Sequence, residues 1–212
     1  TVNAFVYNPY STASQLLSEY VQMCWNTRVT AGTFFASNNL ALPAEYFKAV
    51  GGFDSRWNRA AGEDRDLCDR LIASGYRLVS VPSAIVHHAH FLTLGSFCRQ
   101  HFNYGWGAYA LHQSRARRGA GHIQFEPLTF YLRMIAYPFT KFRLGQAVLF
   151  AMLLGLAQVA NAVGWMDAGL HWFGQRSTAR RGQEVRAFTG TYERLSIFTD
   201  SVKRMLRFLG RT

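Results

Sequence analysis

Apolar residues recur at helical intervals in two stretches of the first half of the chain. In residues 8–28 apolar side chains return every three or four positions, and the same holds for residues 63–74. Ser11 or Thr12 can cap the start of the first stretch, and Gly75 is placed to end the second. The pattern predicts two amphipathic helices. The apolar face of the second is formed by Leu67, Cys68, Leu71 and Ile72.

Three short stretches have the composition of β segments. Residues 33–42 run into a proline, and residues 76–81 and 84–88 flank Pro82. These strands alternate with the predicted helices.

Two further helices are predicted between and after these strands. Pro43 suits the first position of a short helix that stops at Gly51 and Gly52. Residues 91–118 predict a longer helix, which is aromatic and basic and ends before Gly119.

The character of the sequence changes after residue 126. Residues 147–166 hold no charged side chain over 20 positions, enough for a helix to cross roughly 30 Å of hydrocarbon. This run is a candidate transmembrane segment, although Gln158 and Asn161 keep a buried core helix open as the alternative. Basic residues on both flanks do not choose an orientation, so a hairpin or an interfacial helix is also open.

The segments on either side of this run are also candidates for a membrane surface. Residues 127–140 are apolar and too short to span a bilayer alone. Residues 188–208 predict a basic amphipathic helix, for which the alternative is a surface helix packed on the protein.

Composition narrows the class of protein. The 212 residues are 49% apolar and 15% aromatic, but only 17% charged, which excludes disorder and favours a chain that meets lipid as well as water. A net charge of +11 predicts acidic partners: anionic lipids, nucleotide phosphates or nucleic acid. Three cysteines without a C-x-x-C pair indicate neither disulfides nor a zinc knuckle.

The densest group of acids lies at the start of the second predicted helix. Acids there can simply cap the helix and complement its dipole. Asp64 is also predicted to share the inward-facing side of the helix, where a carboxylate kept ionised suits a general base, whereas Glu63 and Asp66 project elsewhere. Asp64 and Asp66 point about 200° apart and are not expected to clasp one metal ion. The group is Glu63, Asp64, Asp66 and Asp69.

Histidines follow the last predicted strand. Alternation places His88 and His90 on one side and His87 on the other. The pair could ligate a metal or form a hydrogen-bonded neutral couple.

Several ordered motifs resemble the acceptor half of a family 2 glycosyltransferase. The resemblance covers residues 30–110 and continues through the aromatic stretch at residues 104–107. The motifs are Asn39-Leu40-Ala41, Gly51-Gly52-Phe53-Asp54, Gly62-Glu63-Asp64-Arg65-Asp66-Leu67, Gly75-Tyr76-Arg77, Val81-Pro82-Ser83-Ala84 and His88-Ala89-His90.

The resemblance implies an α/β fold: a partial GT-A, Rossmann-like domain in residues 1–125, followed by a mainly helical membrane-associated region in residues 126–212. It implies an inverting hexosyltransferase that moves a sugar from a nucleotide-diphosphate sugar to a glycan or lipid-linked acceptor, with a divalent metal, Mg or Mn, on the diphosphate. The expected location is the cytoplasmic face of the plasma (inner) membrane.

The resemblance also assigns roles to residues. It implies that Asp64 deprotonates the acceptor hydroxyl and that Glu63 shapes the acceptor site. His88, and as a second candidate His90, would coordinate the metal or contact the diphosphate. The residues expected to line the acceptor cleft are Asn39, Gly51, Gly52, Asp54, Tyr104 and Trp106.

Two departures from the family pattern matter. The nucleotide-binding half with its metal-binding D-x-D has no counterpart, so we expect the chain to be a C-terminal part that is inactive alone. The Q-x-x-R-W element of processive members is absent, because Gln100 is followed by His101, Phe102, Asn103 and Tyr104. A single-addition transferase is therefore favoured.

Two other functions compete with this one. A non-catalytic basic module on a membrane surface or on nucleic acid would fit the charge but leaves the acid cluster unexplained, and we expect no nucleic-acid partner. A zinc hydrolase built on His88 and His90 lacks the H-E-x-x-H spacing.

Overall fold

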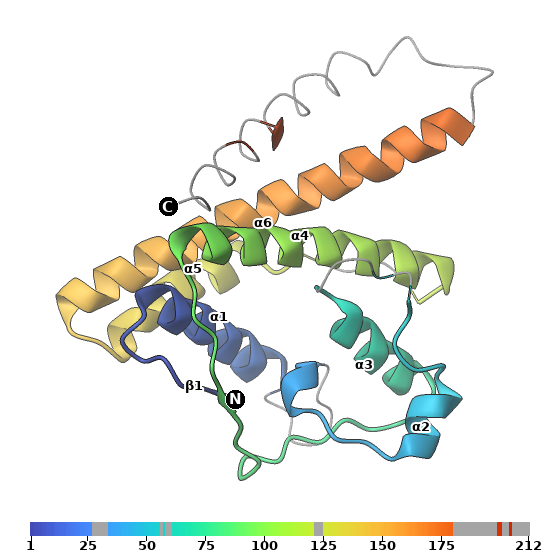
Figure 1. Cartoon of the computed structure of the whole chain (residues 1–212), viewed down its shortest axis with the longest axis horizontal. Helices are drawn as coiled ribbons and strands as arrows, with labels where there is room; N and C mark the ends of the chain where they lie inside the picture. The colour runs from blue at the N-terminus through green and yellow to red at the C-terminus, as the bar shows by residue number, and fades with distance from the viewer. Residues whose placement is uncertain are drawn as a thin grey trace.

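Helix α4 (Leu94–Arg117) lies at the centre of the molecule and packs along α6 (Leu144–Ala179). Helices α1 (Pro9–Trp25) and α3 (Glu63–Ala73) also contact α4 (Figure 1). The computed structural model describes residues 1–26, 34–55, 57, 61–120, 125–179, 199–200 and 204, and the side chains of residues 174–179 are outside this description. Its elements are β1 (Val2–Asn3), α1 (Pro9–Trp25), η1 (Ser37–Asn39), α2 (Ala44–Ala49), α3 (Glu63–Ala73), β2 (His87–His88), α4 (Leu94–Arg117), α5 (Leu128–Ala136), η2 (Tyr137–Thr140) and α6 (Leu144–Ala179).

The predicted helices are confirmed with small changes at their ends. The α1 cap is Asn8 rather than Ser11 or Thr12, because the Asn8 side chain accepts a hydrogen bond from the Ser11 amide at 2.8 Å. Gly75 follows α3 with φ of +85°, the left-handed conformation that glycine adopts without strain. Ile72 was predicted on the buried face of α3 but is exposed.

The predicted strands are largely wrong. Residues 34–42 form an irregular segment around η1, and within residues 76–81 and 84–88 only β2 is a strand. A strand needs a neighbour for its backbone hydrogen bonds, and the neighbour that β2 finds is the two-residue β1, which pairs with it in parallel. The described chain is thus mostly helical, with one two-stranded parallel sheet.

Two apolar cores hold the elements together. The larger is built from α1, α4, α5 and α6 around Phe97 and Leu154, so it includes residues on both sides of residue 126. The smaller lies between α3 and the segments near it in sequence, with Leu67, Cys68 and Leu71 at its centre. Helix α3 therefore has its own core on one side and α4 on the other.

Helices α4 and α6 cross with their backbones in direct contact. A Cβ added to Gly105 would lie 1.8 Å from the Asn161 carbonyl oxygen, and one added to Gly164 would lie 1.9 Å from that of Phe102. No larger residue fits at either point without separating the helices. Aromatic residues extend this contact along α6, where Tyr109 packs edge-on against Trp165.

Helix α6 contains the candidate transmembrane run and extends beyond it. Residues Leu144–Phe173 are long and apolar enough to cross a membrane, with a mean hydropathy of 1.9, yet 44% of the most apolar window is buried inside the molecule. The helix thus has features of both predicted alternatives, an apolar span and a core helix. The basic helix predicted over residues 188–208 lies outside the described residues apart from three positions.

The α4–α6 contact predicts opposite effects for the same substitution at two glycines. Gly105→Ala should lower the free energy of unfolding by at least about 3 kcal/mol, because the new methyl group overlaps the Asn161 carbonyl. Gly155→Ala, in an open position of α6, should raise it by up to about 1 kcal/mol through helix propensity. Urea unfolding followed by circular dichroism measures both. Equal effects at the two positions would contradict the close crossing.

Candidate functional site

The start of α3 is pressed against α4 through two glycines. Gly62 caps α3 with φ of +93°, and a Cβ on Gly107 would lie 2.2 Å from the Ala61 carbonyl oxygen. This approach puts the first turn of α3, with Glu63 and Asp64, beside the middle of α4. The position of the two acids is therefore fixed by backbone packing.

Asp64 is half-buried at this point and lies close to polar side chains of α3 and α4. Its Oδ1 accepts a hydrogen bond from the Arg65 amide at 2.8 Å, which is a capping contact at the first turn. The negative charge of Asp64 acts on Tyr104 of α4 and on the Arg65 guanidinium. Asp64 therefore has a structural partner and also takes part in a wider polar cluster.

Arg65 supplies a half-buried positive charge next to Asp64. Its guanidinium lies over the rings of Trp25 and Phe34, 4.9 Å from each centroid. Burial lowers the pKa of Arg65, while the carboxylate of Asp64 and the hydroxyl of Tyr104 act in the opposite direction. The two rings stabilise the guanidinium by cation–π contact, which leaves its positive charge in place.

Tyr104 joins the acids to the α4 face. Loss of hydration around its hydroxyl and the charge of Asp64 raise the pKa of Tyr104, and a hydrogen bond with the side chain of Gln100, one turn earlier, opposes this. Gln100 is held in turn by Ser14 of α1, whose Oγ accepts from Nε2 at 2.7 Å. Tyr104 is thus a neutral hydroxyl at physiological pH, able to donate or accept a hydrogen bond.

His88 and His90 are brought together as predicted. Their ring centroids are 5.2 Å apart, while His87 is exposed. The segment is anchored on the sheet side by β1, and the Ser11 hydroxyl donates to the His90 carbonyl oxygen. Burial, and then the neighbouring His88, lower the pKa of His90, so its imidazole is neutral at pH 7.

A third histidine, which the motif analysis did not select, lies beside this cluster. His101 of α4 is 1% exposed, and neither ring nitrogen has a hydrogen-bond partner. Its ring packs edge-on against Phe97 and Tyr104, and His90 acts on it electrostatically. Burial lowers the pKa of His101 from 6.5 to about 4, so it is neutral.

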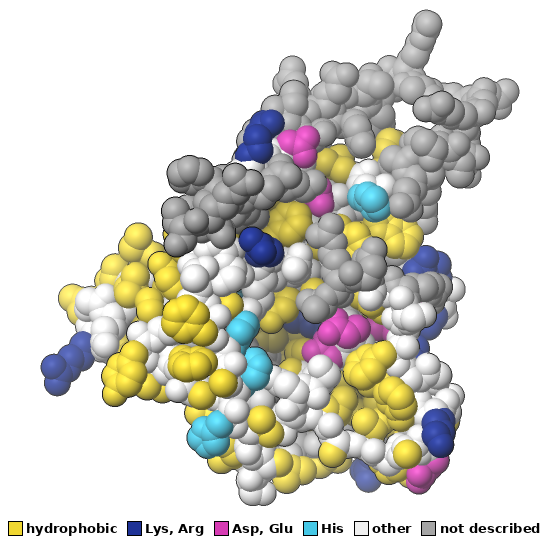
Figure 2. All heavy atoms as spheres, in the orientation of Figure 1, with side chains coloured by type: hydrophobic (Ala, Val, Ile, Leu, Met, Phe, Trp, Pro, Cys, Tyr) yellow, Lys and Arg dark blue, Asp and Glu magenta, His cyan; other side chains and the backbone are white. Residues whose placement is uncertain are grey.

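A second unpaired buried polar atom near Tyr104 belongs to Glu63. Oε2 of Glu63 is buried and has no hydrogen-bond partner among the described residues, and the charge of Glu63 acts on Tyr104. Figure 2 shows histidine and acidic side chains gathered on one face of the molecule, with a hollow between them. Unpaired buried polar atoms at such a place are groups that a bound polar ligand would satisfy.

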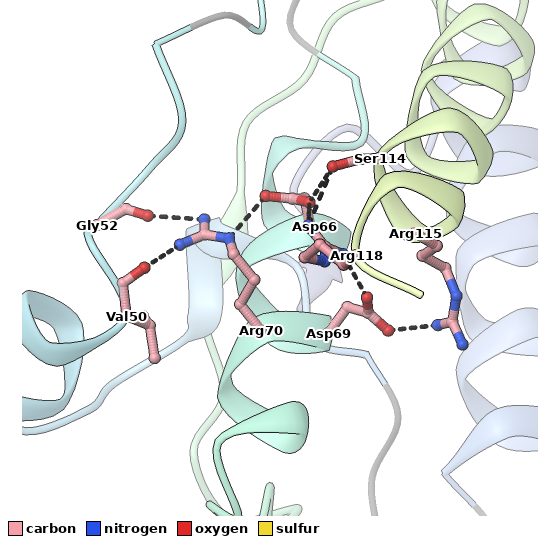
Figure 3. A network of polar contacts seen from close by, with 8 residues as sticks. All are labelled: Val50, Gly52, Asp66, Asp69, Arg70, Ser114, Arg115 and Arg118. Carbon is pink, nitrogen blue, oxygen red and sulfur yellow. Dashed lines mark hydrogen bonds and ion pairs between the residues drawn. The ribbon is translucent and has the colours of Figure 1, made fainter. Parts of the chain in front are cut away.

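The orientation of Asp66 differs from the predicted one. It was expected to project away from the inward side of α3, but it is fully buried between α3 and α4. Oδ2 of Asp66 accepts from Arg70 at 2.8 Å, and Oδ1 accepts from Arg118 at 2.7 Å and from Ser114 at 3.2 Å (Figure 3). Asp66 is therefore a structural carboxylate with every oxygen paired.

Asp69 and Arg70 extend this network at both ends. Asp69 binds Arg115, and its second oxygen accepts from Arg118 at 2.5 Å. Although partial burial alone would lower the pKa of Arg118, its hydrogen bonds to the two carboxylates raise it. The network fixes α3 to the end of α4 (Figure 3).

The loop residues predicted for the cleft serve to hold loops in place. Arg70 donates to the carbonyl oxygens of Val50 and Gly52, at 2.5 and 2.7 Å, which anchors the turn of Gly51 and Gly52 on α3. Asn39 donates through Nδ2 to the Ala84 carbonyl oxygen at 2.9 Å. These contacts are with the protein itself, and a direct role in binding remains a prediction.

Asp54 and Trp106 line a pocket whose walls include none of the four α3 acids. The pocket has a volume of about 170 Å³ and is also lined by Trp57 and Trp172. Trp106 is two positions after Tyr104, which turns it about 200° around α4. The structure therefore divides the predicted cleft residues between two sides of α4.

A comparison with protein families identifies the chain's relatives. A family model described as glycosyl transferase family group 2 matches residues 10–174, more than half of the chain and all of the site described above apart from β1. The chain belongs to this family. Neither a curated protein nor a solved structure matches it. Membership supports glycosyl transfer as the general activity, and an α/β domain as its setting.

The donor set offered to a metal in this family 2 domain is narrow. His88 and His90 offer two imidazoles, and no group of three or more His, Cys, Asp or Glu side chains able to hold a metal occurs within the described residues. Mg²⁺ and Mn²⁺ prefer carboxylate, carbonyl and water oxygens. The histidine pair is by itself a poor fit for either ion, and the divalent metal remains a prediction.

Sequence reasoning missed three members of the candidate site. Gln100, His101 and Arg65 all lie next to Tyr104 or Asp64 in the fold. The spacing of Gln100 and Tyr104 by four positions on a predicted helix was a usable signal, since residues four apart share a face. Nothing in the sequence placed Arg65 between Trp25 and Phe34, because the three come from segments far apart.

The unpaired His101 predicts a pH-dependent stability. Between about pH 6.5 and 4 the imidazole of His101 is protonated in the unfolded chain but remains neutral in the folded one. The free energy of unfolding therefore falls as the pH drops through this window, by up to about 3 kcal/mol in all. His101→Phe should remove this loss and cost nothing at pH 7, because it deletes two unpaired nitrogens. Urea unfolding at pH 7 and 4.5 tests it, with the exposed His87→Phe as the matched control. The same pH slope in both variants would contradict the assignment.

Proposed function

We propose that the chain carries the acceptor side of an inverting, single-addition glycosyltransferase. The donor would be a nucleotide-diphosphate sugar, and the acceptor a hydroxyl of a glycan or a lipid-linked sugar. The observation that carries the proposal is the polar cluster around Tyr104, in which Asp64 and the unpaired Glu63 oxygen lie at the start of α3 and unpaired His101 lies on α4.

The transfer step assigns one role to Asp64. The acceptor oxygen attacks the anomeric carbon, a new C–O bond forms, and the bond to the diphosphate breaks, so that the nucleoside diphosphate leaves with the electron pair. Asp64 takes the proton that the acceptor hydroxyl loses. Asp64 lies in the first turn of α3, where the helix dipole interacts favourably with a negative charge.

The neighbouring groups fit binding and charge stabilisation. The unpaired Glu63 oxygen can accept a hydrogen bond from a second acceptor hydroxyl. His88 or His90 can donate an N–H to the departing diphosphate, and Arg65, beside Asp64, adds positive charge to the site. No step in this proposal requires the histidine pair to hold a metal.

Substitution of Asp64 should separate chemistry from binding. In membranes that contain the active transferase, Asp64→Asn should reduce sugar transfer at least about 100-fold, while the affinity for the sugar nucleotide stays within a few-fold. Asp69→Asn is the control, because Asp69 lies two turns along α3 in the arginine network. Transfer is measured from radiolabelled UDP-glucose, UDP-N-acetylglucosamine and GDP-mannose to endogenous acceptors.

Two results would count against this role. If Asp64→Asn lost donor binding and transfer together, Asp64 would be the helix cap that its bond to the Arg65 amide already makes it. If Asp64→Asn and Asp69→Asn had equal effects on transfer, the loss would reflect the stability of α3.

We further propose that the chain meets the membrane through α5, η2 and the first half of α6. This end exposes a set of large apolar side chains together with Arg133 and Arg143. Apolar residues next to cations match an anionic bilayer surface. The exposed apolar residues are Leu128, Leu132, Phe139, Leu144, Val148, Leu149, Met152 and Val159.

Packing of α6 favours an interfacial position over a complete crossing. The part of α6 from Asn161 onward contacts α4, whose other side carries the polar site. Only residues 144–160 of α6, about 25 Å of helix, do not contact α4 in this way and could enter the bilayer. Within this segment Leu154 and Ala157 are buried in the protein core. This length is below the roughly 30 Å of a hydrocarbon core.

One substitution pair tests the membrane proposal. Met152→Glu should reduce binding to vesicles of phosphatidylglycerol and phosphatidylethanolamine at least about tenfold, because a charge on the exposed face opposes insertion. Val79→Glu is the control, because Val79 is also an exposed apolar residue but lies outside α6. This variant should bind vesicles like the parent. Cosedimentation with vesicles measures both. Equal binding of Met152→Glu and the parent would overturn the assignment.

A further inference from the structure

A pocket between α4, the end of α6 and the loop before α3 contains an unusual concentration of tryptophan. Three of the chain's five tryptophans, Trp57, Trp106 and Trp172, line it, together with Asp54 and Arg117. They come from three parts of the chain: the loop before α3, the middle of α4 and the end of α6. The fold therefore gathers these indoles at one place.

The pocket lining shares no residue with the cluster around Asp64, although it borders the start of α3 through Trp57. Three of its α4 residues, Trp106, Ala110 and Ser114, follow each other at four-residue intervals and so share one face of the helix. Tyr104, which adjoins Asp64, lies about 200° around α4 from Trp106. The proposed transfer chemistry uses none of the pocket's residues.

The pocket wall is rigidly built. Trp57 packs against Gly62, where an added Cβ would lie 2.9 Å from the indole ring, so the conformation at the start of α3 fixes this side chain. The Arg117 guanidinium lies over the Trp172 ring, 5.2 Å from its centroid. Trp106 packs toward His171, with ring centroids 6.4 Å apart.

The chemistry of the lining selects a neutral polyhydroxylated ring. Indole faces accept the apolar C–H face of a pyranose, while the Asp54 carboxylate accepts hydrogen bonds from hydroxyls and the Arg117 guanidinium donates to them. Asp54 and Arg117 carry opposite charges, so the pocket has no net attraction for an anion, and a nucleotide phosphate would meet the Asp54 carboxylate.

The size of the pocket limits the occupant to one ring. Its volume of about 170 Å³ equals roughly six water molecules at about 30 Å³ each, and is below the range of about 300–1,000 Å³ usual for larger ligands. A single sugar unit, with the rest of its chain outside, suits this space.

We propose that the tryptophan pocket is a saccharide-binding subsite, distinct from the transfer site, that holds one pyranose unit of a glycan. The site would keep a glycan on the enzyme independently of the reaction. This proposal does not depend on Asp64 being the base.

The experiment uses the full 212-residue chain labelled with 5-fluorotryptophan. Its five ¹⁹F resonances are assigned with single Trp→Phe variants and followed during titration with the methyl pyranosides of glucose, galactose and mannose. At least one glycoside should shift the resonances of Trp57, Trp106 and Trp172, with a millimolar dissociation constant. Trp25 and Trp165 lie outside the pocket, so their resonances should not move.

Variants make the test specific. Trp106→Leu should weaken glycoside binding at least about tenfold, and Asp54→Asn, a loop change with little risk to folding, should weaken it several-fold. Trp165→Phe and Asp64→Asn should bind like the parent, and retained binding in Asp64→Asn separates this subsite from the transfer site. The proposal is overturned if no glycoside moves the three resonances, if all five move alike, or if uridine monophosphate moves them and the glycosides do not.

Discussion

The arrangement of the whole structure depends on two glycines of α4 that allow backbone contact on opposite sides of one helix. Gly105 admits the α6 backbone at Asn161, and Gly107, two positions later, admits the start of α3 at Ala61. Two positions correspond to about 200° of helix rotation, so α6 and α3 are held on opposing sides. Because both contacts involve carbonyl oxygens, no side-chain rearrangement can accommodate a larger residue at either glycine. The positions of the acids, of the tryptophan pocket and of the apolar helix all follow from this double contact.

The helices could be predicted from the sequence because their signals are local. Caps, glycine stops and apolar spacing placed α1, α2, α3 and α4 within a few residues of their ends. The strands failed because a strand is defined by its partner, and the described chain offers the segment before His88 only the two residues of β1. The long apolar run was correctly placed in a helix, but composition alone does not distinguish lipid from α4 as the surface that covers it.

The site was predicted in part, and the errors have a common origin. Asp64, His88 and His90 were selected from motifs and their order. Asp66 was misplaced because its pattern predicts one buried face on α3, the apolar one, whereas the helix has a second face held against α4 by ion pairs to Arg118. Its partner Arg118 is 52 residues away, a distance at which a single sequence carries no pairing signal. Tyr104 and Trp106 were grouped because they are close in sequence, although helix geometry alone separates them.

Among the buried polar atoms described in α3 and α4, both oxygens of Asp66 are paired, whereas atoms of Glu63 and His101 and Nε of Arg115 are unpaired. Asp66 is fully buried, and both oxygens are paired with arginine or serine, which is the arrangement expected of a group that holds two helices together. Glu63 and His101 leave buried atoms unpaired on either side of Tyr104. An unpaired buried polar atom costs about 1–3 kcal/mol, so folding alone gives no reason for these residue types there. A sugar acceptor or a diphosphate brings the donors and acceptors that would complete them. The contrast within the first turn of α3, where Asp66 is satisfied and Glu63 is not, is therefore a physical argument that Glu63 serves a ligand while Asp66 serves the fold.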